Sequence, residues 1–141
     1  MNAVERLLED HRDLRQAVDA LAGMLHGVTN SDDRLDEAAI QRLSELRGRL
    51  DAEIRAHEER EEAVLAELIG KTDANLVRSV RAEHASIQDV LRLLSSVMIF
   101  VGEGKAYAAK SVVSSLALSL KAHLDHEETE VFPRLESREA R

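Results

Sequence analysis

The chain has 141 residues, a formal net charge of −8 and no cysteine. The lack of cysteine excludes disulfides, thiolate metal sites and cysteine nucleophiles. The acidic balance disfavours nucleic acid and anionic membrane surfaces as partners, because both attract clustered Lys and Arg. The first residues lack the apolar run of a signal peptide, and no segment is apolar for long enough to span a bilayer. We therefore expect a cytoplasmic protein formed by a single domain over residues 1–141.

Apolar residues recur at steps of three and four along most of the chain, which predicts α-helices. Four helices are expected, at residues 4–25, about 36–69, 77–98 and 112–131. Polar or glycine-containing stretches separate them, and we expect Pro133 to end the last one. Four long helices with short links predict an all-α fold, an antiparallel up-and-down four-helix bundle. A coiled coil is the alternative, which the regular interruptions disfavour.

Each apolar stripe is interrupted at one place by polar residues. The first and third helices each place one histidine on the stripe, with the same spacing of apolar residues on either side. The second and fourth helices each place a His-x-x-x-Glu pair there, and residues four apart share a helix face. The residues concerned are His11, His57, Glu61, His84, His123 and Glu127.

These interruptions form an internal repeat. A shift of 73 residues lays His11 on His84, and a shift of 66 lays His57 on His123, with apolar residues matching around both. The third and fourth helices run 17 and 18 residues between their histidines and their link, which makes them level at about 1.5 Å per residue. The first pair fits less well, with 15 residues against 21, and a later start of the second helix or a tilt would level it.

Six polar groups in an aliphatic core are costly unless they are paired or bound to metal. Imidazole suits iron, zinc and copper, and carboxylates can bridge two ions. Four histidines and two glutamates exceed the needs of one ion and fit two. We expect one ion on His11 and His57, the other on His84 and His123, and bridges from Glu61 and Glu127. A bridging oxygen would leave each ion an open position for oxygen, peroxide or nitric oxide.

A single histidine on an apolar face is usually a satisfied core residue, whereas six groups in repeated register favour metal binding. Nearby charges are expected to be solvated rim groups, except that Glu58 is left open as an additional ligand; the others are Glu59, Glu62 and Glu128. His126 and Glu130 form a competing His-x-x-x-Glu pair, but aligning His126 with His57 breaks the match of apolar residues, so His126 is expected at the rim or outside the ligand shell. His26 is expected at the surface. Tyr107 is given no role. Phe100 and Phe132 are expected in the core.

The arrangement of His11, His57-x-x-x-Glu61, His84 and His123-x-x-x-Glu127 resembles the hemerythrin-like, or HHE cation-binding, domain. The resemblance covers about residues 4–135, and the closing segment 123–133 is similar to that family's last motif. It implies a hemerythrin-like bundle with two iron ions in an oxo- or hydroxo-bridged di-iron site. Ferritin-like di-iron bundles are disfavoured, because they use Glu-x-x-His pairs.

One position departs from the oxygen-carrying members, which have a fifth histidine one turn after the third-helix ligand. Gln88 occupies that position here. The resemblance therefore implies a protein closer to the bacterial members that bind, sense or detoxify oxygen, peroxide or nitric oxide, or that repair iron centres. Catalase-like or nitric-oxide-reducing turnover is compatible with a redox metal pair that has open positions. The alternatives are an iron sensor or store, and an interaction bundle without catalytic turnover.

Overall fold

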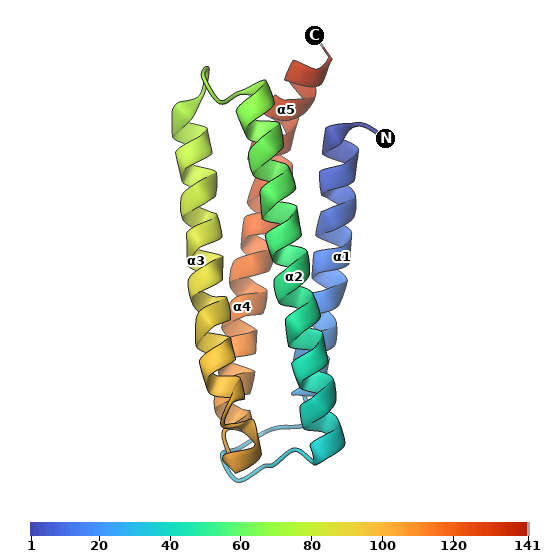
Figure 1. Ribbon diagram of the computed structural model, residues 1–141, viewed down its shortest axis with the longest axis vertical. Helices are drawn as coiled ribbons and strands as arrows, with labels where there is room; N and C mark the ends of the chain where they lie inside the picture. The colour runs from blue at the N-terminus through green and yellow to red at the C-terminus, as the bar shows by residue number, and fades with distance from the viewer. Residues whose placement is uncertain (141) are drawn as a thin grey trace.

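The structure, a computed structural model, describes residues 1–140 as an antiparallel up-and-down bundle of four long helices (Figure 1). The long helices are α1 (Ala3–Met24), α2 (Glu37–Leu68), α3 (Ala74–Met98) and α4 (Ala106–His126). A short turn of 3₁₀-helix, η1 (Val101–Glu103), lies between α3 and α4. After α4 the chain continues through a π-helical segment, η2 (Glu127–Val131), into α5 (Phe132–Glu139). The predicted fold class is confirmed.

Side chains at the helix starts explain where three of the helices begin. Asn2 caps α1 and forms a capping box with Glu5, whose side chain reaches back to the backbone of Asn2. Asp36 accepts a hydrogen bond from the backbone N–H of Ala39, and Asp73 does the same for α3. Each cap satisfies a backbone donor that the first helical turn leaves free.

The apolar core consists of two clusters on either side of the polar residues. The larger one joins the lower parts of the four long helices in Figure 1 and includes Leu21, Leu50, Leu94 and Leu116. The smaller one is formed by the opposite ends of α1, α2 and α3 together with η2 and α5; its members are Val4, Leu7, Leu65, Ile69, Val77, Val80, Val131, Phe132 and Leu135. The two clusters therefore hold a polar layer between them.

The last helix does not end at Pro133, contrary to the prediction. A proline within an α-helix lacks the N–H donor, and its ring clashes with the carbonyl group four residues earlier. Here the preceding turn is widened to π-helical form, and the N–H of Phe132 donates to the carbonyl of Glu127, five residues earlier. Pro133 then stands in the first turn of α5, where no α-helical donor is needed. The chain thus continues to Glu139.

Two further expectations were tested by the packing. Phe132 is buried as predicted, but Phe100 is 47% exposed, because it follows the end of α3 and no longer belongs to its apolar stripe. His11 and His57 lie in one layer although α1 is shorter than α2; the connection between these helices crosses the lower end of the bundle in Figure 1 and buries Leu25 and Val28. A later start of α2 is not needed, since this helix begins at Glu37. Within residues 1–140, the helices are too short or too polar to cross a membrane.

Candidate metal centre

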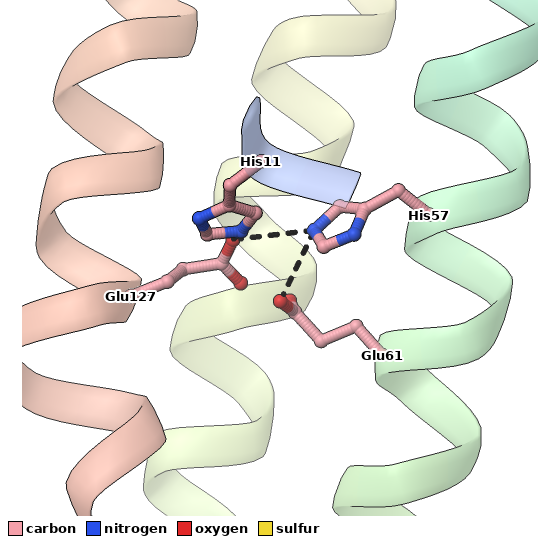
Figure 2. A group of neighbouring side chains, drawn as sticks. All are labelled: His11, His57, Glu61 and Glu127. Carbon is pink, nitrogen blue, oxygen red and sulfur yellow. Dashed lines mark hydrogen bonds and ion pairs between the residues drawn. The ribbon is translucent and has the colours of Figure 1, made fainter. Parts of the chain in front are cut away.

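The six polar residues singled out from the sequence converge in one layer of the bundle. His11 comes from α1, His84 from α3, and the two His-x-x-x-Glu pairs from α2 and from the junction of α4 with η2. All six are buried, none more than 6% exposed. Figure 2 shows four of them, from three helical segments, pointing toward a common point. The apolar clusters on both sides keep this point away from bulk water.

Glu61 lies between two histidines from different helices. One of its oxygens, Oε1, is 2.9 Å from Nε2 of His84, and the other, Oε2, is 3.3 Å from Nε2 of His57. Both histidines thus direct the same ring nitrogen at one carboxylate. This is the position that a carboxylate needs if it is to bridge two cations.

Glu127 faces all four histidines. Its Oε1 is 3.1 Å from Nε2 of both His11 and His123 and 3.5 Å from Nε2 of His57. Figure 2 shows Glu127 beside His11 and His57. Its Oε2 is 4.0 Å from Nε2 of His84. Every histidine of the layer therefore points its Nε2 inward, toward Glu61 or Glu127.

The inward atoms form two overlapping groups of four. One group contains His11 and His57, the other His84 and His123, and both contain Glu61 and Glu127. Within each group the ligand atoms lie within 4.8 Å of one another. Two His and two shared carboxylates per group match the composition expected for a binuclear metal site.

Three carboxylates that contact the outward Nδ1 atoms of these histidines were not predicted from the sequence. Nδ1 of His57 is 3.1 Å from Asp10, and Nδ1 of His123 is 2.7 Å from Glu83. Nδ1 of His11 is 3.1 Å from Glu128, a residue we had expected to be solvated. The internal repeat carried a signal for two of them: the 73-residue shift that aligns the single histidines also lays Asp10 on Glu83.

These outer carboxylates determine which ring nitrogen can bind a cation. A carboxylate accepts hydrogen bonds, so the Nδ1 atoms of His57, His123 and His11 donate, and a neutral ring then carries its lone pair on Nε2. The lone pairs therefore face Glu61 and Glu127, which are acceptors too. Such a set of inward acceptors is stable when cations lie between them, and metal-ligating histidines typically donate their other N–H to a carboxylate.

In the metal-free chain, protons take the place of these cations. Burial alone would lower the pKa of His57, but its hydrogen bond with Asp10 and the nearby carboxylates of Glu127 and Glu61 outweigh it and raise this pKa well above its ordinary value. Burial would lower the pKa of His123 as well, but neighbouring carboxylates, chiefly Glu127, outweigh it and raise this pKa. Burial would raise the pKa of Glu127, yet the surrounding histidines hold it well below its usual range. The layer thus attracts positive charge strongly.

Asp10 is held in a charged state by two partners. Burial would raise its pKa, but hydrogen bonds with His57 and Arg60 lower it to about 2. The guanidinium of Arg60 contacts both Asp10 oxygens, at 2.9 and 2.7 Å. Asp10 therefore remains a carboxylate across the neutral pH range and keeps His57 in one orientation.

The π-helical segment positions two consecutive glutamates around one histidine. Glu127 contacts Nε2 of His11, and Glu128 contacts Nδ1 of the same ring. Phe132, at the end of this segment, packs against the ring with centroids 4.9 Å apart. The widened turn that accommodates Pro133 is therefore also part of the site.

Residues at the edge of the layer either form hydrogen bonds and ion pairs beside it or lie exposed to solvent. Glu58 is partly buried, its pKa is raised by burial, and it accepts a hydrogen bond of 3.2 Å from the amide of Gln88. Glu59 is exposed, and His26 lies at the surface as expected. His126 stands outside the inward groups and contacts Glu83 at 3.2 Å, in agreement with its expected place at the rim.

The donor set fits two metal ions. Within residues 1–140, Nε2 of His57 and His123 and Oε2 of Glu61 and Glu127 are buried without a hydrogen-bond partner. Unpaired polar atoms in a core are costly, so this cluster requires bound cations or protons. Imidazole and carboxylate together suit first-row transition metals.

The fold and this buried cluster define a helical bundle built to bind cations. The hemerythrin HHE cation binding domain matches residues 2–140, and the chain therefore belongs to that family. The resemblance inferred from the sequence is confirmed. None of the curated proteins and none of the solved structures shows a significant match to this chain.

Proposed function

We propose that this chain is a non-haem di-iron protein of a single domain that binds or reacts with oxygen, peroxide or nitric oxide, in sensing, detoxification or iron handling. The proposed ligands are His11 and His57 for one iron, His84 and His123 for the other, and Glu61 and Glu127 for both. The observation that carries the proposal is the overlap of two buried four-residue groups on the same two carboxylates. Two irons held by these residues would supply redox chemistry toward a small ligand.

The surroundings of the layer favour a small ligand of low charge. One turn away on either side lie fully buried aliphatic residues, among them Ile54, Leu65, Leu120 and Val131. An apolar wall of this kind excludes bulk water and admits neutral diatomic molecules more readily than charged substrates. The aliphatic residues around the layer would thus keep a bound metal pair dry, and the four imidazoles and two carboxylates would balance its charge.

The environment of Gln88 supports an open position on the His84 side. Its amide donates to Glu58, so it is engaged with that carboxylate and not with the inward groups. The position that carries a fifth imidazole in oxygen carriers therefore contributes no ligand nitrogen here. This difference supports ligand binding or reaction in preference to oxygen transport.

The test is the metal content and visible spectrum of protein purified from iron-supplied cells. We expect about two irons per chain, since each of the two groups offers a complete set of donors, and charge-transfer bands of a bridged iron pair. Addition of oxygen, peroxide or nitric oxide should then change the spectrum, and the fastest and tightest response identifies the ligand. One ion per chain, or a bound metal other than iron, would contradict the proposal.

A further inference from the structure

The first half of the site contains His11 and His57, and the second half contains His84 and His123. The two halves differ in the residues that contact the outward Nδ1 atoms of these histidines. Resting on the proposed two-ion centre, we infer that its two positions exchange metal at different rates. The ion on His11 and His57 is held firmly, whereas the ion on His84 and His123 enters last and leaves first, through an acidic hollow between α2 and α3.

On the first half, both outer carboxylates are anchored by arginines. Arg60 contacts Asp10 through two nitrogens, and Asp10 in turn contacts Nδ1 of His57. Arg15 forms ion pairs with Glu128, which contacts Nδ1 of His11, and with Asp125 at 2.7 Å. Each imidazole is therefore fixed by a chain of charge-assisted hydrogen bonds.

On the second half, the corresponding support is weaker. Glu83 contacts Nδ1 of His123 but is shared with His126. His84 is 4% exposed, and among the described residues 1–140 its Nδ1 has no hydrogen-bond partner. The carboxylate that faces this nitrogen, Glu62, is 3.8 Å away. His84 is thus buried, but no hydrogen bond to its Nδ1 from the described residues fixes the orientation of its ring.

The sequence repeat shows that this difference is encoded residue by residue. The 73-residue shift that lays His11 on His84 places Gln88 where the first half has Arg15. The 66-residue shift lays Glu62 on Glu128 and His126 on Arg60. The outer carboxylates recur in both halves, but neither arginine does. Glu62 instead has the exposed Arg81 at 3.6 Å, a longer and more solvated ion pair than the one between Arg60 and Asp10.

A hollow next to His84 offers a route for cations. It has a volume of about 230 Å³, lies between α2 and α3, and is lined by Arg55, Glu58, Glu59, Glu62 and Gln88. Three carboxylates against one guanidinium give it a negative potential that attracts cations. Glu62 lines the hollow and also faces the unpartnered Nδ1 of His84, so this one carboxylate connects the hollow with the less firmly held histidine.

An imidazole whose Nδ1 is fixed by a hydrogen bond keeps its orientation when its bond to the metal breaks. The same nitrogen can therefore bind the ion again before the ion leaves. Residues that orient ligating histidines typically change metal affinity about 10- to 100-fold when they are replaced. His84 lacks such a residue, and rotation of its ring opens the second position toward the hollow. The difference in release rate follows from this difference in orientation.

The experiment measures release of ferrous iron from the anaerobically loaded chain into an excess of a colour-forming chelator, by stopped flow. We expect two phases of one iron each. Arg15→Gln places in the first half the glutamine that the second half has at the equivalent position 88. It should speed the slow phase about tenfold, the lower end of the effect on metal affinity that residues orienting a ligating histidine typically have. Gln88→Arg is the reciprocal change and should slow the fast phase. Arg49→Gln is the matched control, because Arg49 pairs with Glu53 away from the site.

Uptake provides a second readout that does not depend on these variants. Glu62→Gln should slow binding of the second iron roughly two- to fivefold at low salt, because it removes one charge from the hollow. Glu67→Gln, at an exposed position of the same helix, should leave it unchanged.

Release of both irons in one phase would overturn the inference while leaving the two-ion centre intact. Equal acceleration of both phases by Arg15→Gln would show a general loss of structure and would overturn it too. A fast phase that Gln88→Arg leaves unchanged or speeds has the same consequence. Loading of fewer than two irons would instead refute the proposed function, and this inference with it.

Discussion

Metal stoichiometry should respond differently to a residue of one group and to a residue shared by both. His57 belongs to the first group of four alone, whereas Glu61 belongs to both. His57→Ala should therefore release one ion and Glu61→Ala both. The distinction follows from the geometry, because Glu61 contacts His57 and His84 with different oxygens.

The size of the effect can be estimated from four-ligand sites. Metal binding to such sites is worth about 10–16 kcal/mol, so one ligand contributes about 3 kcal/mol, or about 100-fold in affinity. If both positions had the same dissociation constant, a free metal concentration about ten times that value would leave about 1.8 ions on the unaltered chain. His57→Ala should then hold about 1.0 ion and Glu61→Ala about 0.2.

The assay is equilibrium dialysis against buffered metal, followed by elemental analysis, with circular dichroism to verify that each variant remains helical. His26→Ala and Glu67→Ala are matched controls at exposed positions and should retain the full content. Equal metal content in His57→Ala and Glu61→Ala would refute the shared-carboxylate geometry. Two ions in both variants would refute the ligand assignment altogether.

Three further results are expected from the packing and the charges. The pKa values of His57 and His123 are raised in the metal-free fold. Their protonation therefore contributes its full stabilisation below about pH 6.5, and this stabilisation is lost as pH rises through the raised values. The melting temperature of chelated protein should fall from pH 6.5 upward, and a rise would contradict this. Leu50→Ala empties a fully buried position and should cost about 2–5 kcal/mol in urea unfolding, against about 0.5 kcal/mol or less for exposed Leu118. Gly104 has φ +90°, so Gly104→Ala should lower the free energy of unfolding by about 1 kcal/mol, and an unchanged midpoint would contradict the strain.

The sequence was sufficient to predict the fold and to select the six inward residues, for a physical reason. Polar residues on an apolar stripe are visible because helical periodicity assigns each residue to a face. The repeat then identified His123 and Glu127 in preference to His126. The structure brings the six together, and their role as ligands stays a prediction.

The outer carboxylates could not be assigned in the same way, because their partners lie on other helices. Asp10 precedes His11 in sequence but contacts His57, and Glu83 precedes His84 but contacts His123. Such contacts depend on the rotation of neighbouring helices about their axes, which periodicity does not give. The passage through Pro133 was missed for a related reason: a widened turn has no signal in apolar spacing.

The polar layer also divides the molecule into two bodies of unequal size. The smaller apolar cluster, at the end of the bundle where α1 begins and where α5 lies in Figure 1, is joined to the larger one by helices that cross the layer. Without bound cations, the centre of the layer is linked through protons on histidines, and only its edge is supported by the ion pairs of Arg15 and Arg60. Amide hydrogen exchange near Leu7 and Leu65 should then proceed by local opening, independently of the region around Leu50, whereas bound metal would merge both into one cooperative unit.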